Sequence, residues 1–281
     1  MPIEFIIDNG RIEQTVQTGQ CTYDSISRAD LIEEGVDISE MTDMQIADQC
    51  ISDIEPCTFQ DCISLSSVTM SDHIQYIGSN AFNDCTNLSS ITIPNSVINV
   101  GSGAFSNCTS LSNVEISTEL SGISDNMFCN CALTSVTIPN SVSGIGIDAF
   151  RECRSLSSVT IPDSVSGISA GAFHVCESLS SITIPNSVSI IGESTFYYNE
   201  SLKSVEIGSG VTEIGDSAFR YCSNLSEVKI HATNPPTLGV NAFDHTSHEL
   251  TIYVPSGKIG TYSMAENWSK YSTCIKELPT T

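Results

Sequence analysis

The stretch that decides the fold is SITIPNSVSIIGESTFYYNESLKSVEIGSGVTEIGDSAF, residues Ser181 to Phe219, which repeats one pattern almost twice. Each copy holds a short β-favouring segment, a turn, a second apolar pair, a glycine and a phenylalanine. The phenylalanine recurs at Phe59, Phe82, Phe105, Phe128, Phe150, Phe173, Phe196, Phe219 and Phe243. The steps between these positions are 23, 23, 23, 22, 23, 23, 23 and 24 residues. The chain is therefore built from one unit of about 23 residues.

A period between 20 and 29 residues is typical of a leucine-rich-repeat solenoid. The predicted fold class is accordingly a β-rich α/β solenoid of about nine 23-residue repeats, with short parallel strands and a cap at both ends. In such an array each repeat buries its apolar face on its neighbours, so no single core grows with chain length.

Each repeat carries an alternating segment of the form L-x-x-[I/V]-x-[I/M], such as LSSITI from Leu179 and LKSVEI from Leu202. Alternation places two apolar residues on the buried side of a strand and the residue between them outside. A proline such as Pro185 ends the strand, because proline cannot donate a hydrogen bond to the next strand. A glycine such as Gly215 follows on the return limb, where it either adopts a costly backbone conformation or permits close packing. The phenylalanines are expected to stack between the two limbs.

Seven of the twelve cysteines stand three residues after a repeat phenylalanine. They are Cys62, Cys85, Cys108, Cys131, Cys153, Cys176 and Cys222. One cysteine per repeat favours a ladder of small, buried, reduced thiols that pack as apolar side chains. Asn199 and Thr246 fill the same position in two other repeats, so the position does not require pairing. No C-x-x-C pair occurs, and no metal site is expected at these cysteines.

Residues 1–58 lie outside the clear period and are predicted to form an N-terminal cap, because open solenoids cover their first apolar edge. The segment EFIIDNGRIEQTV predicts a β-hairpin around Asn9-Gly10. The segment SRADLIEEG predicts a helix that begins after Ser27 and stops at Gly35. Residues Val36 to Ile38 are interpreted as a degenerate first repeat strand, followed by a helical or irregular segment through Cys50.

The repeat array is predicted over residues 59–255, and residues 256–281 are predicted to form a C-terminal cap helix. Tyr262, Ala265, Trp268, Tyr271 and Ile275 stand near helical spacing in that last segment. Their aromatic face is expected to close the array.

The unit C-x-x-L-x-x-[I/V]-x-I-P-x-S-V-x-x-I-G-x-x-A-F resembles the BspA-like (Treponema pallidum-type) leucine-rich repeats over about residues 51–255. The ending NPPTLGVNAF…IYVPSGKIGTYSMAENWSKY is similar to the closing segment common in such proteins from gut bacteria. The resemblance implies a right-handed curved solenoid with its parallel strands on the concave side. It also implies adhesion at a cell surface, with matrix proteins, other cells or glycans as partners.

The chain is strongly acidic, with 33 acidic and 10 basic residues and a net charge of −23. Nucleic acid is therefore not expected as a partner, because phosphate binding needs clustered lysine and arginine. The start MPIEFIIDNGRIEQ has no basic segment and no long apolar run, so it is not expected to be a signal peptide. No stretch approaches 18 apolar residues, so membrane insertion is not expected. The resemblance favours a cell-surface or extracellular location, with a cytoplasmic or virion-associated one as the alternative.

The outward strand positions are mostly serine and threonine, which are ordinary exposed strand residues. They change character toward the C-terminal end, where charges and an aromatic residue enter neighbouring strands. The predicted binding residues on this surface are Thr160, Thr183, Glu206, Glu227, Lys229 and Tyr253.

No catalytic residues, cofactor or metal are predicted. The sequence contains no G-x-S-x-G, P-loop or H-E-x-x-H motif. His245 and His248, with Glu249 beside them, have the spacing of two metal ligands, but no third ligand is evident.

Two functions remain open at this point. One is a non-catalytic module that recognises a protein or glycan with the solenoid surface. The other is a structural or decoration subunit of a larger particle such as a virion, docking on an assembly partner through residues 1–58.

Overall fold

The computed structural model describes residues 5–8, 11–14, 25–33, 35–46 and 50–279. It confirms the predicted fold class: a parallel-strand β-solenoid of about 10 turns with a spacing of about 23 residues and little helix. The chain divides into two compact units, unit 1 (Met1–Leu133) and unit 2 (Thr134–Thr281). The division falls within the single 22-residue step of the phenylalanine series, between Phe128 and Phe150. The predicted boundaries at residues 58 and 255 stay predictions.

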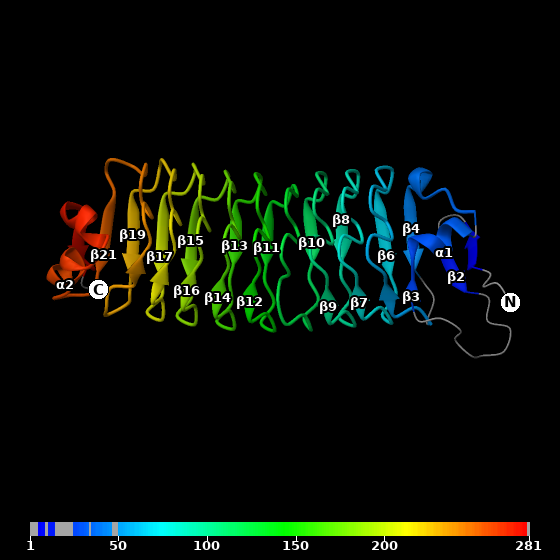
Figure 1. Cartoon of the computed structure of the whole chain (residues 1–281), viewed down its shortest axis with the longest axis horizontal. Coiled ribbons are helices and arrows are strands. Elements are labelled where there is room, and N and C mark those ends of the chain that lie inside the picture. The colour runs from blue at the N-terminus through cyan, green and yellow to red at the C-terminus, as the bar shows by residue number, and fades with distance from the viewer. Residues whose placement is uncertain (1–4, 9–10, 15–24, 34, 47–49, 280–281) are drawn as a thin grey trace. The chain divides into compact units, whose positions relative to one another are not determined.

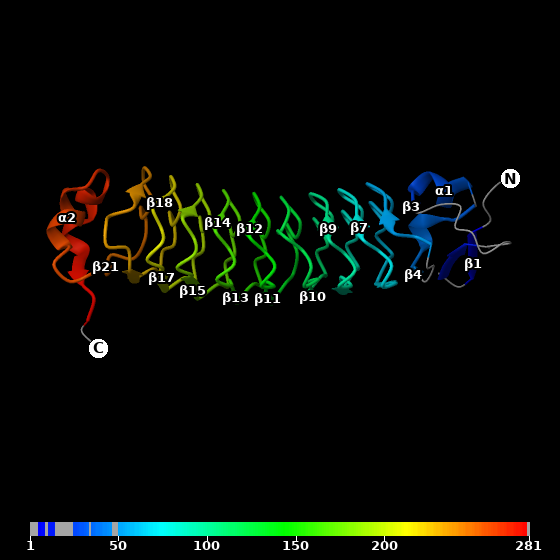
Figure 2. The ribbon, with the colours of Figure 1, turned by 90° about the horizontal axis from the view of Figure 1, so that it is seen from below.

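Unit 1 has strands on two sides, a strand face and a return side (Figures 1 and 2). The strand face holds β1 (Phe5–Asp8), β2 (Arg11–Gln14), β4 (Asp43–Ile46), β6 (Ser67–Met70), β8 (Ser90–Thr92) and β10 (Asn113–Glu115). The return side holds β3 (Ser25–Ile26), β5 (Asp53–Ile54), β7 (Tyr76–Ile77) and β9 (Asn99–Val100). Except for the hairpin, the pairs within these sheets are parallel. Parallel stacking of equivalent residues explains why one sequence pattern specifies successive turns.

The hairpin of β1 and β2 is present, and its Asn9-Gly10 turn lies outside the described residues. β2 continues in parallel onto β4, so the hairpin extends the strand face. The helix also forms where it was predicted, as α1 (Arg28–Glu33). Ser27 and Asp30 form a reciprocal cap: the Ser27 backbone donates to Asp30 Oδ2 at 2.9 Å, and the Asp30 backbone donates to Ser27 Oγ at 3.2 Å.

The prediction of a degenerate first strand at Val36 to Ile38 is wrong. This segment leads into the short 3₁₀ helix η1 (Ile38–Glu40), and the strand is β4, where a helical or irregular segment was expected. Met44 of β4 pairs with Val68 of β6 and is buried. Met41, Met44 and Ile46 thus occupy the spacing that a leucine and two aliphatic residues occupy in later repeats.

Unit 2 has the same two-sided pattern within itself (Figures 1 and 2). Its strand face holds β11 (Ser135–Thr137), β13 (Ser158–Thr160), β15 (Ser181–Ile184), β17 (Ser204–Ile207), β19 (Glu227–Ile230), β21 (Thr251–Val254) and β22 (Ile275–Glu277). Its return side holds β12 (Gly144–Ile145), β14 (Gly167–Ile168), β16 (Ile190–Ile191), β18 (Glu213–Ile214) and β20 (Thr237–Leu238). The pairs within these sheets are parallel.

The core of each unit contains the predicted ladder of phenylalanine rings. In unit 1, rings from successive repeats stack at 5.2, 5.4 and 5.7 Å from Phe59 to Phe128. In unit 2 they stack at 5.3, 5.5, 5.2 and 5.2 Å from Phe150 to Phe243. Full burial of each ring contributes about 1.5–3 kcal/mol.

The repeated cysteines are thiols, as expected, but besides packing as apolar side chains they form hydrogen bonds to backbone carbonyl groups. Cys222 Sγ lies 3.1 Å from the carbonyl oxygen of Phe196, and Cys108 Sγ lies 3.2 Å from that of Phe82. Each thiol therefore donates to the phenylalanine of the preceding repeat. Burial raises the pKa of both thiols to about 12.

The glycines of the return limb allow the backbones of neighbouring repeats to approach each other closely. A Cβ on Gly215 would lie 2.5 Å from the backbone nitrogen of Glu193 in the preceding repeat. Since Gly215 has no positive φ, the second of the two interpretations in the sequence analysis holds at this position.

The C-terminal segment is not the single helix that was predicted. It forms α2 (Ile259–Met264), the 3₁₀ helix η2 (Trp268–Cys274) and strand β22, which pairs in parallel with β21. Asn267, with φ of 61°, interrupts the helix. Trp268 is fully buried, and its Nε1 donates to the carbonyl oxygen of Pro236 at 2.7 Å.

An ion pair fastens this segment to the last repeat. Lys270 Nζ lies 2.6 Å from Asp244 Oδ2, and the Tyr271 hydroxyl donates to Asp244 Oδ1 at 2.8 Å. Burial alone would raise the pKa of Asp244, but these hydrogen bonds outweigh it and hold the pKa below its usual value.

Candidate binding surface

Four outward side chains from neighbouring strands form a continuous row on the strand face of unit 2. The register places Thr183 of β15 beside Glu206 of β17, and Glu206 beside Lys229 of β19. Lys229 lies beside Tyr253 of β21. We call these four residues the strand-face row.

The chemistry of this position changes along the unit. Thr137 and Thr160 are paired on β11 and β13, and β13 lies next to β15 (Figure 1). Threonine at this position is an ordinary exposed strand residue. The following strands substitute Glu206, Lys229 and Tyr253, which supply both charges and an aromatic ring. Aromatic residues are enriched at protein interfaces, and charged groups steer the approach of partners.

The charged members of the surface are paired but open to solvent. Lys229 Nζ lies 2.8 Å from Glu227 Oε1 on the same strand, and this hydrogen bond raises the pKa of Lys229 above its usual value. Glu206 Oε1 lies 2.8 Å from His231 Nε2. The Glu206 side chain is 51% exposed. Exposed ion pairs contribute little to stability, so these charges are available for a partner.

A hollow of about 550 Å³ opens where the strands of this face end. Its polar lining consists of Asp163, Thr183, Asn186, Glu206, Ser209 and His231. Asn186 is held in place because its Oδ1 accepts from the Ser209 backbone at 2.8 Å. The hollow thus joins two members of the strand-face row to fixed polar groups.

The structure brings the predicted site residues together only in part. Thr183 and Glu206 lie in the row and line the hollow. Lys229 and Tyr253 continue the row away from the hollow. Glu227 lies in the adjacent column between Ser204 and Thr251, where it pairs with Lys229. Thr160 is exposed on β13 and lines no part of the hollow.

Two residues of this surface were not predicted. His231 follows Lys229 by two positions, so strand alternation placed it on the same side and was a usable signal. Lys276 of β22 pairs with Tyr253, and its Nζ lies 3.5 Å from Thr251 Oγ1. No signal for Lys276 existed, because β22 lies outside the repeat pattern.

A second hollow, of about 620 Å³, lies on the return side of unit 2 beside α2 and η2. Its lining includes Glu193, Glu213, Asp216 and Glu266. In the part of the chain that the structure describes, no group of three His, Cys, Asp or Glu is placed to hold a metal ion. Of the two histidines whose spacing suggested metal ligands, His245 stacks its ring on that of Tyr221, with 4.5 Å between the ring centroids.

The sequence matches the profile of the BspA type Leucine rich repeat region over residues 37–157 and 143–267. No curated protein matches the chain. Across the described ranges, no helix has the length and apolar character needed to cross a bilayer.

Solved structures of bacterial proteins are similar to the chain. A leucine rich cell surface protein from Faecalibacterium prausnitzii is 23% identical, with a TM-score of 0.43, over 100% of this chain and 97% of that one. A leucine-rich repeat protein from Bacteroides ovatus is 20% identical, with a TM-score of 0.48, over 99% and 98%. A leucine-rich repeat protein from T. pallidum is 21% identical, with a TM-score of 0.41, over 88% and 86%.

Proposed function

Because the chain belongs to the family of BspA-type leucine-rich-repeat proteins, we propose that it is a non-catalytic recognition module. It binds a protein or glycan through the strand-face row of unit 2. The observation that carries the proposal is the change within unit 2 from threonine on β11, β13 and β15 to Glu206, Lys229 and Tyr253 on the strands that follow, beside a polar hollow. A rigid sheet presents these groups at fixed positions, which lowers the entropy lost on binding.

The proposal includes a location at the cell surface or outside the cell. The leucine-rich-repeat family supports this location, and the disulfide bond formed by Cys50 is consistent with it. Disulfides persist in oxidising surroundings and are rare in the reducing cytosol.

In this proposal residues 1–58 act as a cap. The parallel pairing of β2 with β4 supports capping over docking on an assembly partner, because the hairpin continues the sheet of the array. Light scattering of the full chain checks this point, since a cap leaves the protein monomeric at concentrations where a docking hairpin forms assemblies.

An array of matrix proteins and glycans, probed with the folded full chain, tests the function. We expect at least one component to bind, and the binding to weaken in Lys229→Ala and Tyr253→Ala. The matched control is Thr92→Ala, which changes the equivalent position on β8 of unit 1. The proposal is contradicted if the folded protein binds no component of the array.

A further inference from the structure

Two positions after each repeat phenylalanine, one residue adopts the left-handed region of backbone conformation. The φ angles at these positions lie between 55° and 62°. In unit 1 the residues are Asp61, Asp84, Asn107 and Asn130. In unit 2 they are Glu152, Val175, Tyr198, Tyr221 and His245. We call these positions the left-handed column.

The residues of this column differ between the two units in the free energy that the left-handed conformation costs them. Asparagine and aspartate tolerate the left-handed region, because their short polar side chains bond locally. Valine and tyrosine do not have this compensation, and a β-branched residue there is an outlier. Unit 2 therefore carries strain at this column that unit 1 avoids. Backbone strain that persists is a reason to look for function at the side chains concerned.

Three rings of the left-handed column, those of Tyr198, Tyr221 and His245, lie in an aromatic cluster on the turn that leads into the strands. Tyr197 packs against Tyr198 at 6.0 Å and against Tyr221 at 5.4 Å, between ring centroids. The Tyr221 ring stacks on His245 at 4.5 Å, and the His174 ring stacks on Tyr197 at 5.0 Å. Tyr198 is the most exposed of these three tyrosines, at 41%.

A guanidinium completes the cluster. The Arg220 guanidinium carbon lies 4.9 Å from the centroid of the Tyr221 ring, and its Nη2 lies 3.4 Å from the Tyr221 hydroxyl. Its Nε is buried and has no hydrogen-bond partner within the described chain. We call Tyr197, Tyr198, Arg220, Tyr221 and His245 the turn-edge patch.

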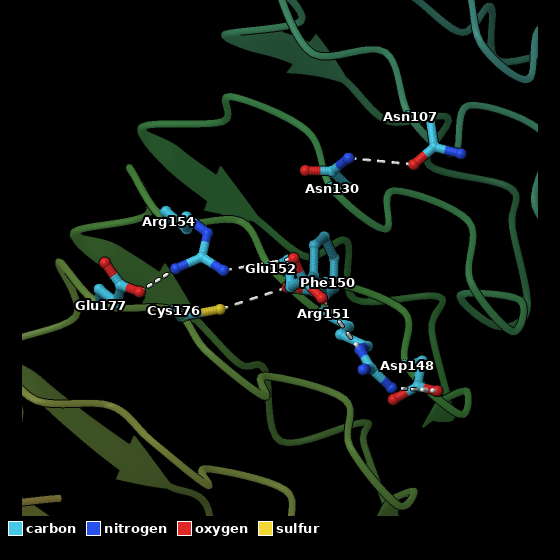
Figure 3. A network of polar contacts seen from close by, with 9 residues as sticks. All are labelled: Asn107, Asn130, Asp148, Phe150, Arg151, Glu152, Arg154, Cys176 and Glu177. Atoms are coloured by element: carbon cyan, nitrogen blue, oxygen red, sulfur yellow. Dashed lines mark hydrogen bonds and ion pairs between the residues drawn. The ribbon is translucent and has the colours of Figure 1, made fainter.

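Arg220 differs from the other arginines of this edge. Figure 3 shows Arg154 between Glu152 and Glu177, and Arg151 beside Asp148. Arg220 forms no such ion pair with any carboxylate that the structure describes. An unneutralised guanidinium in a chain of net charge −23 favours a ligand that brings its own carboxylate.

Spacing and charge select the kind of ligand. The ring centroids of Tyr198 and Tyr221 are 5.6 Å apart, and those of Tyr221 and His245 are 4.5 Å apart. An extended peptide repeats its same-side groups about every 6.6 Å, which is longer than this spacing. One sugar unit of an extended polysaccharide is close to it. The net charge of −23 opposes a densely charged polyanion, so the carboxylates of the ligand must be sparse.

We propose that the turn-edge patch binds an extended saccharide chain with isolated carboxylates, one of which pairs with Arg220 while the sugar rings lie along Tyr198, Tyr221 and His245. This site lies where the strands begin, whereas the hollow lies where they end. It gives the recognition module a second contact surface, and it stands or fails independently of the strand-face row.

The test uses the folded full chain on an array of uronic-acid and sialic-acid saccharides, each printed beside its carboxyl-reduced form. A hyaluronan hexasaccharide, in which uronic acid alternates with an uncharged sugar, is one probe. We expect binding to a carboxylate form and loss of binding on carboxyl reduction. Affinity should fall about tenfold or more in Arg220→Gln and in Tyr198→Asn.

Controls separate this site from a folding defect and from the strand face. Tyr198→Asn should keep or raise the melting temperature, because asparagine suits the left-handed region. Val175→Asn introduces asparagine in the same column without removing a ring, and Thr92→Ala changes a strand-face residue outside the strand-face row. Both variants should bind the acidic saccharide as wild type does. The proposal is overturned if the folded protein binds none of the acidic saccharides, or if it binds acidic peptides alone. It is also overturned if Arg220→Gln binds the saccharide with unchanged affinity.

Discussion

Val175→Asn is expected to stabilise the protein, although it replaces an aliphatic residue with a polar one. Val175 adopts φ of 60°, where Asn107 and Asn130 of unit 1 adopt 60° and 55°. The left-handed region costs an ordinary L-residue about 1–2 kcal/mol, and asparagine tolerates it best after glycine. Because Val175 is half-buried, the exchange also loses part of the roughly 1.5 kcal/mol that full burial of a valine contributes. The net gain is about 0.5–1 kcal/mol.

The reverse exchange at the equivalent position of unit 1 should have the opposite sign and a larger size. Asn107→Val introduces the backbone cost of about 1–2 kcal/mol. It also removes the hydrogen bond that Asn130 Nδ2 donates to Asn107 Oδ1 at 3.0 Å (Figure 3), worth about 1 kcal/mol. The expected loss is therefore about 2–3 kcal/mol.

Urea unfolding of the full chain, followed by circular dichroism, measures both changes in the free energy of unfolding. A gain of 1 kcal/mol corresponds to a melting temperature about 2–4 °C higher for a domain of this size. The reasoning is refuted if Val175→Asn destabilises by as much as Asn107→Val, since side-chain contacts would then outweigh the backbone conformation.

Three further predictions concern the scaffold. Gly215→Ala should destabilise because its Cβ would lie 2.5 Å from a backbone nitrogen, whereas Gly167→Ala, with nothing within 4 Å, should be neutral or stabilising in the same urea assay. The pKa of Asp244 is held below its usual value, so the stability that Asp244 contributes is present above about pH 4 and is lost as the pH falls through its folded-state pKa. An acid titration followed by Trp268 fluorescence should show the C-terminal segment loosening over that range. Asp244→Asn should abolish this pH dependence. Burial raises the pKa of Cys108 to about 12, so iodoacetamide should label it in urea and not in the folded protein; equal labelling in both states contradicts the buried ladder.

The repeats could be predicted from the sequence because each one repeats the same environment. Leu179 through Ile184 alternate so clearly that strand β15 follows from side-chain spacing alone. β4 was missed because Met41 and Met44 replace the usual leucine and valine, although their spacing is unchanged. β22 has no repeat signal, and its pairing with β21 arises from tertiary packing.

The candidate surfaces could be predicted less well. The strand-face row follows from alternation and register, and the structure places Thr183, Glu206, Lys229 and Tyr253 side by side. The turn-edge patch could not be found in this way. Its column contains aspartate, asparagine, valine, tyrosine and histidine, which share no propensity, and only the backbone angles reveal that they face the same constraint.

The most direct test of the account is the dissociation constant of the first matrix protein or uncharged glycan found on the array. It is measured for wild type and for a variant of the strand-face row that lacks both charges and the aromatic ring. The variant Glu206→Ala/Lys229→Ala/Tyr253→Ala should weaken binding by about a hundredfold or more, since each hot-spot residue accounts for about 1–2 kcal/mol. The matched variant Thr69→Ala/Thr92→Ala/Glu115→Ala, in the same column of unit 1, should bind as wild type. Equal affinity of both variants would contradict the claim that recognition lies where the outward residues cease to repeat.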